Sequence, residues 1–164
     1  MMWRRQAGFS LIELLASAAI LGLLASVAVP VVETSIRREK ERALRIALRE
    51  MREGIDAYKR AAMAGMIDTS NAPNGYPPSL IELVGGVVDK RDNNPNVNER
   101  KRFYFMRRIP RNPFCTTPSL SAMDCWAQRS FASPPTAPLA GNDVFDVYAD
   151  TDQVGLNGVP YREW

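Results

Sequence analysis

The residues of this chain that could do chemistry are mainly acids and two cysteines. The chain has no histidine, no glycine-rich phosphate loop and no evident base beside any serine, so nucleophilic catalysis is not expected. Four aspartates lie within ten residues of one another, in turn-rich sequence: Asp143, Asp146, Asp150 and Asp152. Their carboxylates could supply oxygen ligands to a cation, although such acids more often form turns or line solvated strands. We therefore expect a protein that is not an enzyme.

A single acid lies in a long apolar run near the N-terminus. Residues 9–32 number 24, and Glu13 is the only charged residue among them. At about 1.5 Å per residue, a helix of this length spans the hydrocarbon core of a bilayer, about 30 Å thick. A carboxylate costs about 2.5–3.5 kcal/mol at the centre of a membrane, so Glu13 needs a cationic partner. A new N-terminal amine at Phe9 of a neighbouring copy would serve if the chain were cut after Gly8.

A short basic leader, residues 1–8, precedes the run. It carries Arg4 and Arg5 and no acid, which predicts that this end stays in the cytoplasm while the rest of the chain lies outside. An ordinary signal peptide loses its apolar run on cleavage, whereas a cut after Gly8 would retain it. We expect a single-pass membrane protein with its C-terminal domain outside the cytoplasm, which the family resemblance described below would place in the inner membrane and the periplasm. A plain anchored domain that never assembles remains an alternative.

The sequence Gly8-Phe9-Ser10-Leu11-Ile12-Glu13-Leu14 resembles the processing motif of type IV pilins and type II secretion pseudopilins. The resemblance implies that a prepilin peptidase cuts after Gly8 and methylates the amine of Phe9. It also implies that Glu13 pairs with the N-terminal amine of an adjacent subunit in a filament. The family's helix-kinking proline is matched by Pro30, which could instead mark the end of the helix at the membrane surface.

The second half of the chain resembles the soluble domain of G-type pseudopilins. The matching segments are residues 76–80, residues 108–114, Trp126 and residues 143–164. This resemblance implies an α+β fold of the type IV pilin kind, in which a long N-terminal helix packs on a small antiparallel β-sheet. Many members bind calcium near the C-terminus, and here Asp150 and Asp152 would be the best ligands. The spacing matches no EF-hand, and the longer glycine-rich form of the family's loop is missing.

The family resemblance also implies a function and partners. The chain would be a structural subunit of a type II secretion pseudopilus, which supports protein export across the outer membrane. Its partners would be other copies of itself, minor pseudopilins, the prepilin peptidase, the inner-membrane assembly platform and the membrane. A type IV pilin or minor pilin that serves adhesion, DNA uptake or motility is the alternative. Basic and acidic residues are interleaved, so we expect no nucleic-acid binding.

Beyond the membrane segment we expect an amphipathic spine helix over residues 33–66 and a periplasmic globular region over residues 67–164. One helical stripe is apolar: Leu44, Leu48, Met51, Ile55, Tyr58 and Ala62. The opposite surface is charged and is expected to face solvent: Arg37, Arg38, Glu39, Lys40, Glu41, Arg42, Arg45, Arg49, Glu50, Arg52, Glu53, Lys59 and Arg60. A sheet built from the rest of the chain would cover the apolar stripe.

Local patterns predict the smaller elements of the globular region. A capping box at Ser79 predicts a short helix over residues 79–84. Strands are expected at residues 103–106, 129–132 and 144–148, and alternation in the last places Asp146 on its solvent face. Asn157-Gly158 predicts a type I′ turn. In an oxidising compartment Cys115 and Cys125 would form a disulfide that closes a small loop, whereas in the cytosol both would be free thiols.

Overall fold

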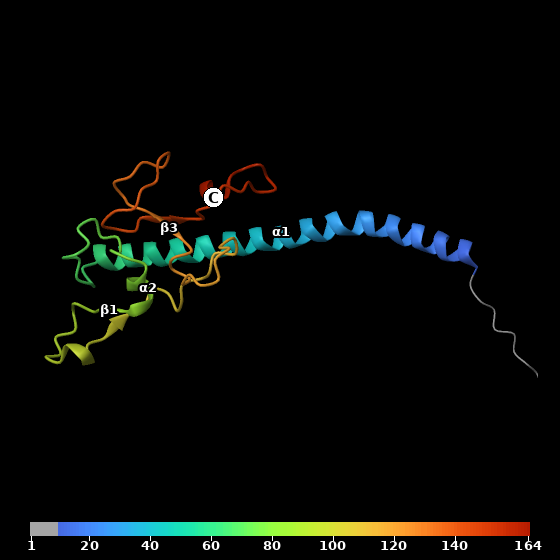
Figure 1. Cartoon of the computed structure of the whole chain (residues 1–164). Coiled ribbons are helices and arrows are strands. Elements are labelled where there is room, and N and C mark those ends of the chain that lie inside the picture. The colour runs from blue at the N-terminus through green and yellow to red at the C-terminus, as the bar shows by residue number, and fades with distance from the viewer. Residues whose placement is uncertain (1–9) are drawn as a thin grey trace, which may run out of the picture. The chain divides into compact units, whose positions relative to one another are not determined.

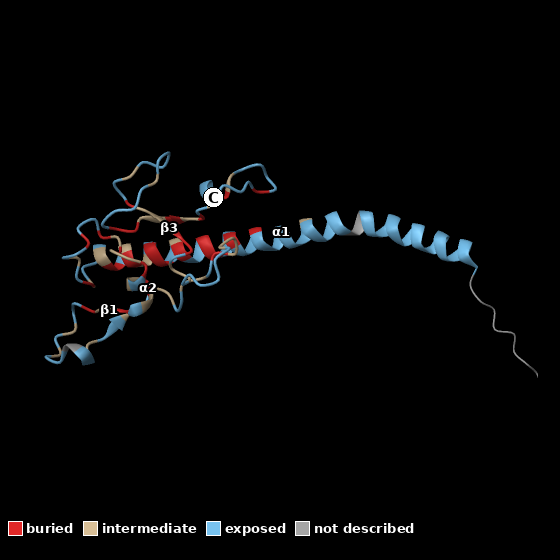
Figure 2. Cartoon of the chain, in the orientation of Figure 1, coloured by how far each residue is buried: buried red, intermediate tan, exposed pale blue. Residues whose placement is uncertain are grey.

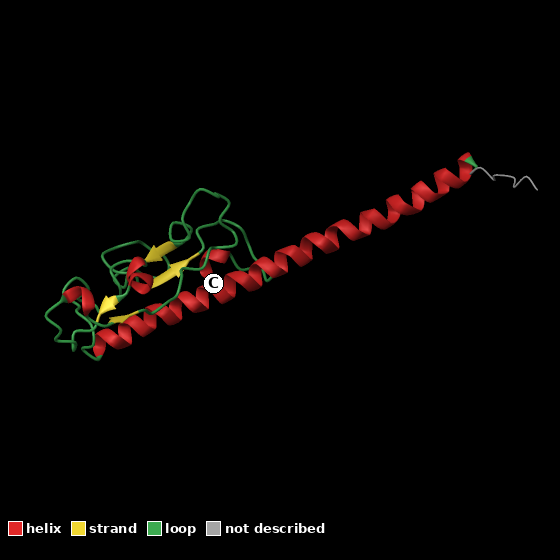
Figure 3. Ribbon diagram, turned by 90° about the horizontal axis from the view of Figure 1, so that it is seen from below, coloured by secondary structure: helices red, strands yellow, loops and turns green. Residues whose placement is uncertain are grey.

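The computed structural model describes residues 10–164, including the side chains of all but 27, 28 and 97. The helices and strands follow one another as α1 (Leu11–Met63), α2 (Ile81–Gly85), β1 (Val87–Val88), β2 (Arg102–Phe103), β3 (Ala127–Arg129) and β4 (Asp146–Tyr148), as Figures 1 and 3 show. Two 3₁₀ turns, Val97–Glu99 and Tyr161–Glu163, complete the order. This is the predicted α+β fold. The chain divides into two compact units, Met1–Glu39 and Lys40–Trp164.

In the first unit, the described side chains of α1 are almost all exposed. Leu11 is 75% exposed and Leu23 is 71% exposed, because no part of the described chain covers them. The most apolar 18-residue window of α1 has a mean hydropathy of 2.3, so by length and composition this helix could cross a membrane. Pro30 lies inside α1, so it does not mark the end of the helix. The hydroxyl of Thr34 donates to the carbonyl oxygen of Pro30 at 2.8 Å.

In the second unit, the predicted apolar stripe of α1 forms the centre of the core. Figure 2 shows buried positions along this part of the helix and on the segments that cover it. Five residues of the predicted stripe are buried: Leu44, Leu48, Met51, Ile55 and Tyr58. The sixth, Ala62, is half-buried, and its neighbour Ala61 is buried instead. They pack with side chains from the loops, α2 and the strands: Ile67, Leu80, Leu83, Trp126, Val144, Val147 and Tyr161.

The strands form two small antiparallel pairs rather than one sheet. β1 pairs with β2, where Val87 lies opposite Phe103, and β3 pairs with β4, where Gln128 lies opposite Val147. Each strand is only two or three residues long, so side-chain packing on α1 contributes more to holding the segments than the ladders do. Two strands begin and end earlier than predicted. The strand expected at residues 103–106 is β2, which ends at Phe103, and the strand expected at residues 129–132 is β3, which ends at Arg129.

Two local predictions are wrong in detail. The short helix α2 begins at Ile81, its N-cap residue is Leu80, and no side chain caps it, so the box at Ser79 does not form. The segment around Asn157 does fold back, with Val154 bridged to Pro160. Within the described residues only glycines have positive φ, so Asn157 cannot occupy a type I′ turn. Gly158, at a φ of 81°, supplies the left-handed residue alone.

Candidate functional site

Glu13 lies in the first turn of α1, where the helix dipole favours a negative charge. Its main-chain N–H donates to the carbonyl oxygen of Ser10 at 3.0 Å, and its carbonyl oxygen accepts from the hydroxyl of Ser17 at 2.6 Å. Within residues 10–164, no cationic side chain pairs with its carboxylate. Gly8 and Phe9, the predicted cleavage and methylation positions, lie outside the described residues. The described part of this site is therefore a lone acid in an exposed apolar helix.

Asp143 is buried and serves the fold. Its carboxylate accepts hydrogen bonds from the side-chain amide of Asn74 at 2.8 Å, the hydroxyl of Ser130 at 2.7 Å and the main-chain N–H of Phe131 at 2.9 Å. Burial by itself raises the pKa of Asp143, but these donors, helped by the nearby charge of Lys59, hold that pKa below its ordinary value. The carboxylate therefore joins the loop around Asn74 to the segment that follows β3.

The alternation predicted that Asp146 lies on the solvent-facing side of β4, but the structure shows its carboxylate paired with two arginines. Its carboxylate accepts from Nε of Arg52 on α1 at 2.8 Å and lies 3.6 Å from Nη2 of Arg129 on β3. Arg52 is therefore not part of a purely solvated face of the helix. The three residues link the helix to both strands of the β3–β4 pair, which is a structural role for Asp146.

The other two aspartates lie apart from this network. Asp150 is exposed, and Asp152 pairs with Arg162 on the 3₁₀ turn. Among residues 10–164, no group of three or more His, Cys, Asp or Glu side chains gathers in a way that could hold a metal. Calcium takes six to eight oxygen ligands, and the carboxylates of Asp143 and Asp146 already accept from other side chains. The four aspartates therefore do not fit a single calcium site.

The two cysteines form the predicted disulfide, with a Cα–Cα distance of 5.6 Å between Cys115 and Cys125. Hydrogen bonds between residues of the loop, which the sequence did not reveal, also hold it together. The guanidinium of Arg111 donates to the carbonyl oxygens of Leu120 at 2.8 Å and Thr117 at 2.7 Å. The buried amide of Asn112 donates to the carbonyl oxygen of Cys125 at 3.1 Å. The disulfide and these hydrogen bonds therefore hold the loop between Arg111 and Cys125 together.

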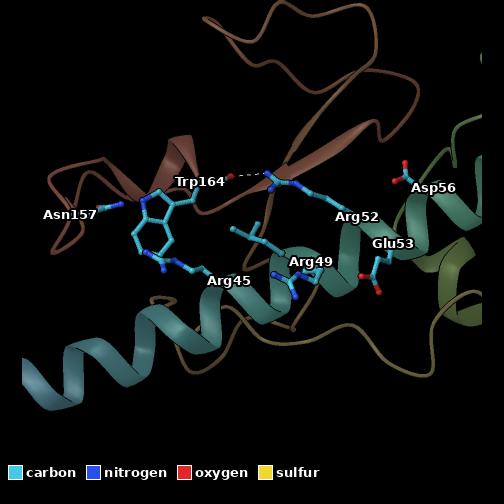
Figure 4. Close-up of a pocket in the computed structure, with 8 residues that line it drawn as sticks. Arg45, Arg49, Arg52, Glu53, Asp56, Asn157 and Trp164 are labelled. Atoms are coloured by element: carbon cyan, nitrogen blue, oxygen red, sulfur yellow. Dashed lines mark hydrogen bonds between the residues drawn. The ribbon is translucent and has the colours of Figure 1, made fainter.

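A pocket of about 450 Å³ lies beside α1, between Arg45 and Asp56, with Asn157 and Trp164 on its other side (Figure 4). The guanidinium of Arg45 lies 4.4 Å from the centre of the Trp164 ring, within the range of a cation–π contact. Nη2 of Arg52 donates to the carbonyl oxygen of Trp164 at 2.7 Å. No nucleophile with an activating base lines this pocket, and its charged side chains all come from α1.

Glu41 was expected on the solvated face of the helix, but it is buried, at 7% exposure. Its carboxylate accepts from the main-chain N–H of Leu156 at 2.7 Å and from the hydroxyl of Tyr161 at 2.9 Å. Glu41 thus holds the C-terminal segment against α1. Its position could have revealed this role, because it lies three residues before Leu44, on the line of the apolar stripe.

Two comparisons with known proteins bear on this arrangement. Residues 3–29 match the family model described as the prokaryotic N-terminal methylation motif, which includes Gly8, Phe9 and Glu13. The type II secretion system core protein G of Dickeya chrysanthemi is 27% identical over 113 residues. That alignment covers 69% of this chain and 66% of the relative, just under two thirds of the relative's length. No solved structure matches significantly.

These findings agree with the resemblance that the sequence suggested. The chain carries the N-terminal methylation motif of the type IV pilin superfamily and is distantly similar to a major pseudopilin. Pilins and pseudopilins are structural proteins, which confirms the prediction that this chain is not an enzyme.

Proposed function

We propose that this chain, a protein with the N-terminal methylation motif of the type IV pilin superfamily, is a structural subunit of a type II secretion pseudopilus. The observation that carries the proposal is Glu13, a lone acid in an exposed apolar helix, four residues after Phe9 of the Gly8-Phe9 pair. The distant similarity to a secretion core protein supports secretion as the process that the filament serves.

The chemistry of assembly follows from the cost of an unpaired carboxylate in lipid. A prepilin peptidase cuts between Gly8 and Phe9 and methylates the new amine, which keeps its positive charge. The anchored chain waits in the inner membrane, with its C-terminal domain in the periplasm. When copies pack together on the inner-membrane assembly platform, the amine of Phe9 of one copy neutralises Glu13 of another. The pairing selects one register among many that apolar packing alone would allow. Minor pseudopilins would join through the same segment.

Two properties of α1 fit this role. Its first part is apolar and exposed on all sides, as a helix must be when its neighbours are lipid or other copies. Pro30 within the helix removes one main-chain donor, and we propose that it bends the segment so that the copies can pack around a filament axis.

The test compares two acids of the same helix. Glu13→Gln removes the charge from the apolar segment and keeps its size, whereas Glu33→Gln removes an exposed charge outside residues 9–32. We expect both variants to be inserted and cleaved normally. Loss of a pair worth about 2 kcal/mol weakens association about thirtyfold, so Glu13→Gln alone should abolish most filament assembly. Normal assembly of Glu13→Gln would contradict the proposal.

A type IV pilin is the second candidate function, because the methylation motif at residues 3–29 is common to both kinds of filament. Deletion of the gene separates the two candidates. A secretion subunit is required for release of exported proteins into the medium, whereas a pilin is required for surface pili, adhesion, DNA uptake or motility.

A further inference from the structure

The hairpin over residues 154–160 presents apolar side chains to solvent. Val154 is bridged to Pro160, and the main-chain N–H of Gly155 donates to the carbonyl oxygen of Val159 at 2.8 Å. Three apolar side chains of this hairpin are exposed, at 42%, 45% and 37%: Val154, Leu156 and Val159. Apolar side chains that gather in one exposed turn mark a surface that another molecule covers.

Trp164 and Arg45 lie beside this hairpin. The Trp164 ring lies against the main chain of Gly155, where an added Cβ would come within 2.6 Å of the ring. The guanidinium of Arg45 lies 4.4 Å from the centre of the same ring. Figure 4 shows Arg45 and Arg49 on α1, with Trp164 and Asn157 across the pocket from them. The hairpin and these cations of α1 therefore border one surface.

The exposed charges of α1 beside the hairpin are all basic. Between residues 40 and 49 the one acid, Glu41, is buried, and its carboxylate accepts from the main-chain N–H of Leu156 in the hairpin. The exposed charged residues of this stretch are Lys40, Arg42, Arg45 and Arg49. Among residues 10–164, none of these four cations forms an ion pair. We define the hairpin face as these four cations together with Val154, Leu156, Val159 and Trp164.

The hairpin face lies close to the apolar run along the chain. Lys40 follows Val32, the last residue of that run, by eight residues, which is about 12 Å of helix. The charges between them, two acids and two arginines, cancel: Glu33, Arg37, Arg38 and Glu39. The next exposed acids lie farther along α1: Glu50, Glu53 and Asp56. Net positive charge is thus concentrated in the part of the second unit that is nearest in sequence to the apolar run.

We propose that the hairpin face binds the headgroup surface of anionic phospholipids in the bilayer that holds α1. The inference rests on one part of the proposed function, the membrane anchorage of residues 9–32, and not on filament assembly. Arginine and lysine side chains are attracted to an anionic lipid surface, and tryptophan side chains settle at the membrane–water interface. Exposed apolar side chains gain by burial at the boundary between headgroups and acyl chains. The hairpin face combines all three, so it holds the second unit on the membrane before copies assemble.

A second copy of the chain is the other molecule that could cover this face. A parallel neighbour anchored in the same bilayer would bring its own four cations to the same level of the helix, where like charges repel. Lipid headgroups offer the opposite charge to all four cations at once and also accept the apolar side chains of the hairpin. Charge complementarity therefore favours lipid over a second copy.

The experiment places the full chain in lipid nanodiscs that hold one copy each. One variant carries Leu156→Cys, labelled with a dye that is quenched by nitroxide groups on lipids near the headgroups. The matched control is Leu139→Cys with the same label, because Leu139 is an equally apolar residue outside the hairpin face and is 66% exposed. In anionic discs, quenching at position 156 should be at least about fivefold stronger than at position 139. Neutral lipid or high salt should weaken it.

A second comparison tests the cations of the face. Arg42→Gln/Arg49→Gln removes two of them, and Lys90→Gln/Lys101→Gln removes two exposed charges outside the face. Arg45 is left intact because it contacts Trp164. Each cation near an anionic surface strengthens binding about fivefold, so the arginine pair should lower the docking equilibrium constant, measured by quenching at position 156, about 25-fold. The lysine pair should leave it within about twofold, and equal effects of the two pairs would overturn the proposal.

The outcomes separate this inference from the filament that the chain is proposed to build. Equal quenching at positions 156 and 139, or equal quenching in neutral and anionic discs, refutes lipid docking and leaves the filament proposal standing. No quenching with single copies, together with a cross-link between copies through Leu156→Cys in discs that hold two, assigns the face to a second copy and refutes lipid docking. Normal assembly of Glu13→Gln contradicts the filament proposal and leaves the docking of single copies standing. A chain whose α1 does not insert into the discs refutes both.

Discussion

Replacing Glu41 by alanine should destabilise the second unit more than any other single change at an acid of α1. The carboxylate accepts from the main-chain N–H of Leu156 at 2.7 Å and the hydroxyl of Tyr161 at 2.9 Å. Hydrogen bonds to a charged group contribute about 1.5–3 kcal/mol each. Leu156 is 45% exposed, so water can partly replace its lost partner, whereas Tyr161 is fully buried. We therefore expect a loss of about 3 kcal/mol in the free energy of unfolding.

The assay is thermal and urea unfolding of the full chain in detergent micelles, followed by near-ultraviolet circular dichroism of the core aromatics. For a chain of this size about 3 kcal/mol lowers Tm by about 6–12 °C. Glu39→Ala is the matched control, because it removes an exposed acid two residues earlier and should change stability by less than about 0.5 kcal/mol.

A double-mutant cycle with Tyr161→Phe tests the reasoning itself. If the two side chains act through their hydrogen bond, the double mutant should lose less unfolding free energy than the sum of the two single mutants, by at least about 1 kcal/mol. Strictly additive losses, or a Glu41→Ala variant as stable as Glu39→Ala, would refute the assignment of Glu41 as the link to the C-terminal segment.

Three further predictions concern the globular unit. Replacing Cys115 and Cys125 by serine should lower the free energy of unfolding by about 2.5–3 kcal/mol, because the unfolded chain is then no longer constrained by the disulfide. A reducing agent should lower the Tm of the unmodified chain but leave the Tm of this variant unchanged. The pKa of Asp143 is lower in the folded chain than its ordinary value of 3.8. The ionised carboxylate therefore stabilises the fold at pH values above 3.8, and this stabilisation is lost as the pH falls through the lower pKa of the folded chain. In Asp143→Asn the acid limb of a Tm-against-pH curve should therefore be shallower, and an unchanged limb would refute this. Adding calcium or a chelator should leave Tm unchanged, since the four aspartates do not form one site, and a rise of several degrees would contradict that conclusion.

The features that the sequence predicted well are those set by neighbours along the chain. The apolar run and the stripe from Leu44 to Tyr58 repeat at helical spacing, so α1 and its buried face could be read directly. The alternation around Val147 placed β4. The disulfide followed from the expected compartment and the small separation of its two cysteines.

The features that it missed depend on partners far away in sequence. Asp146 meets Arg52 at a separation of 94 residues, and Asp143 meets Asn74 at a separation of 69 residues. Spacing among the aspartates themselves suggested a shared cation, whereas the carboxylates of Asp143 and Asp146 accept from different, distant segments. The short strands β2 and β3 were displaced because two- and three-residue strands are fixed by packing on α1 and not by their own propensity.

The measurement that tests the central claim most directly is the intact mass of the chain purified from the membranes of its own host. The account predicts a chain that begins at Phe9 and carries one added methyl group, because only a freed amine at that position can neutralise Glu13 of a neighbour. A chain that still begins at Met1, and that remains monomeric in the membrane, would contradict it.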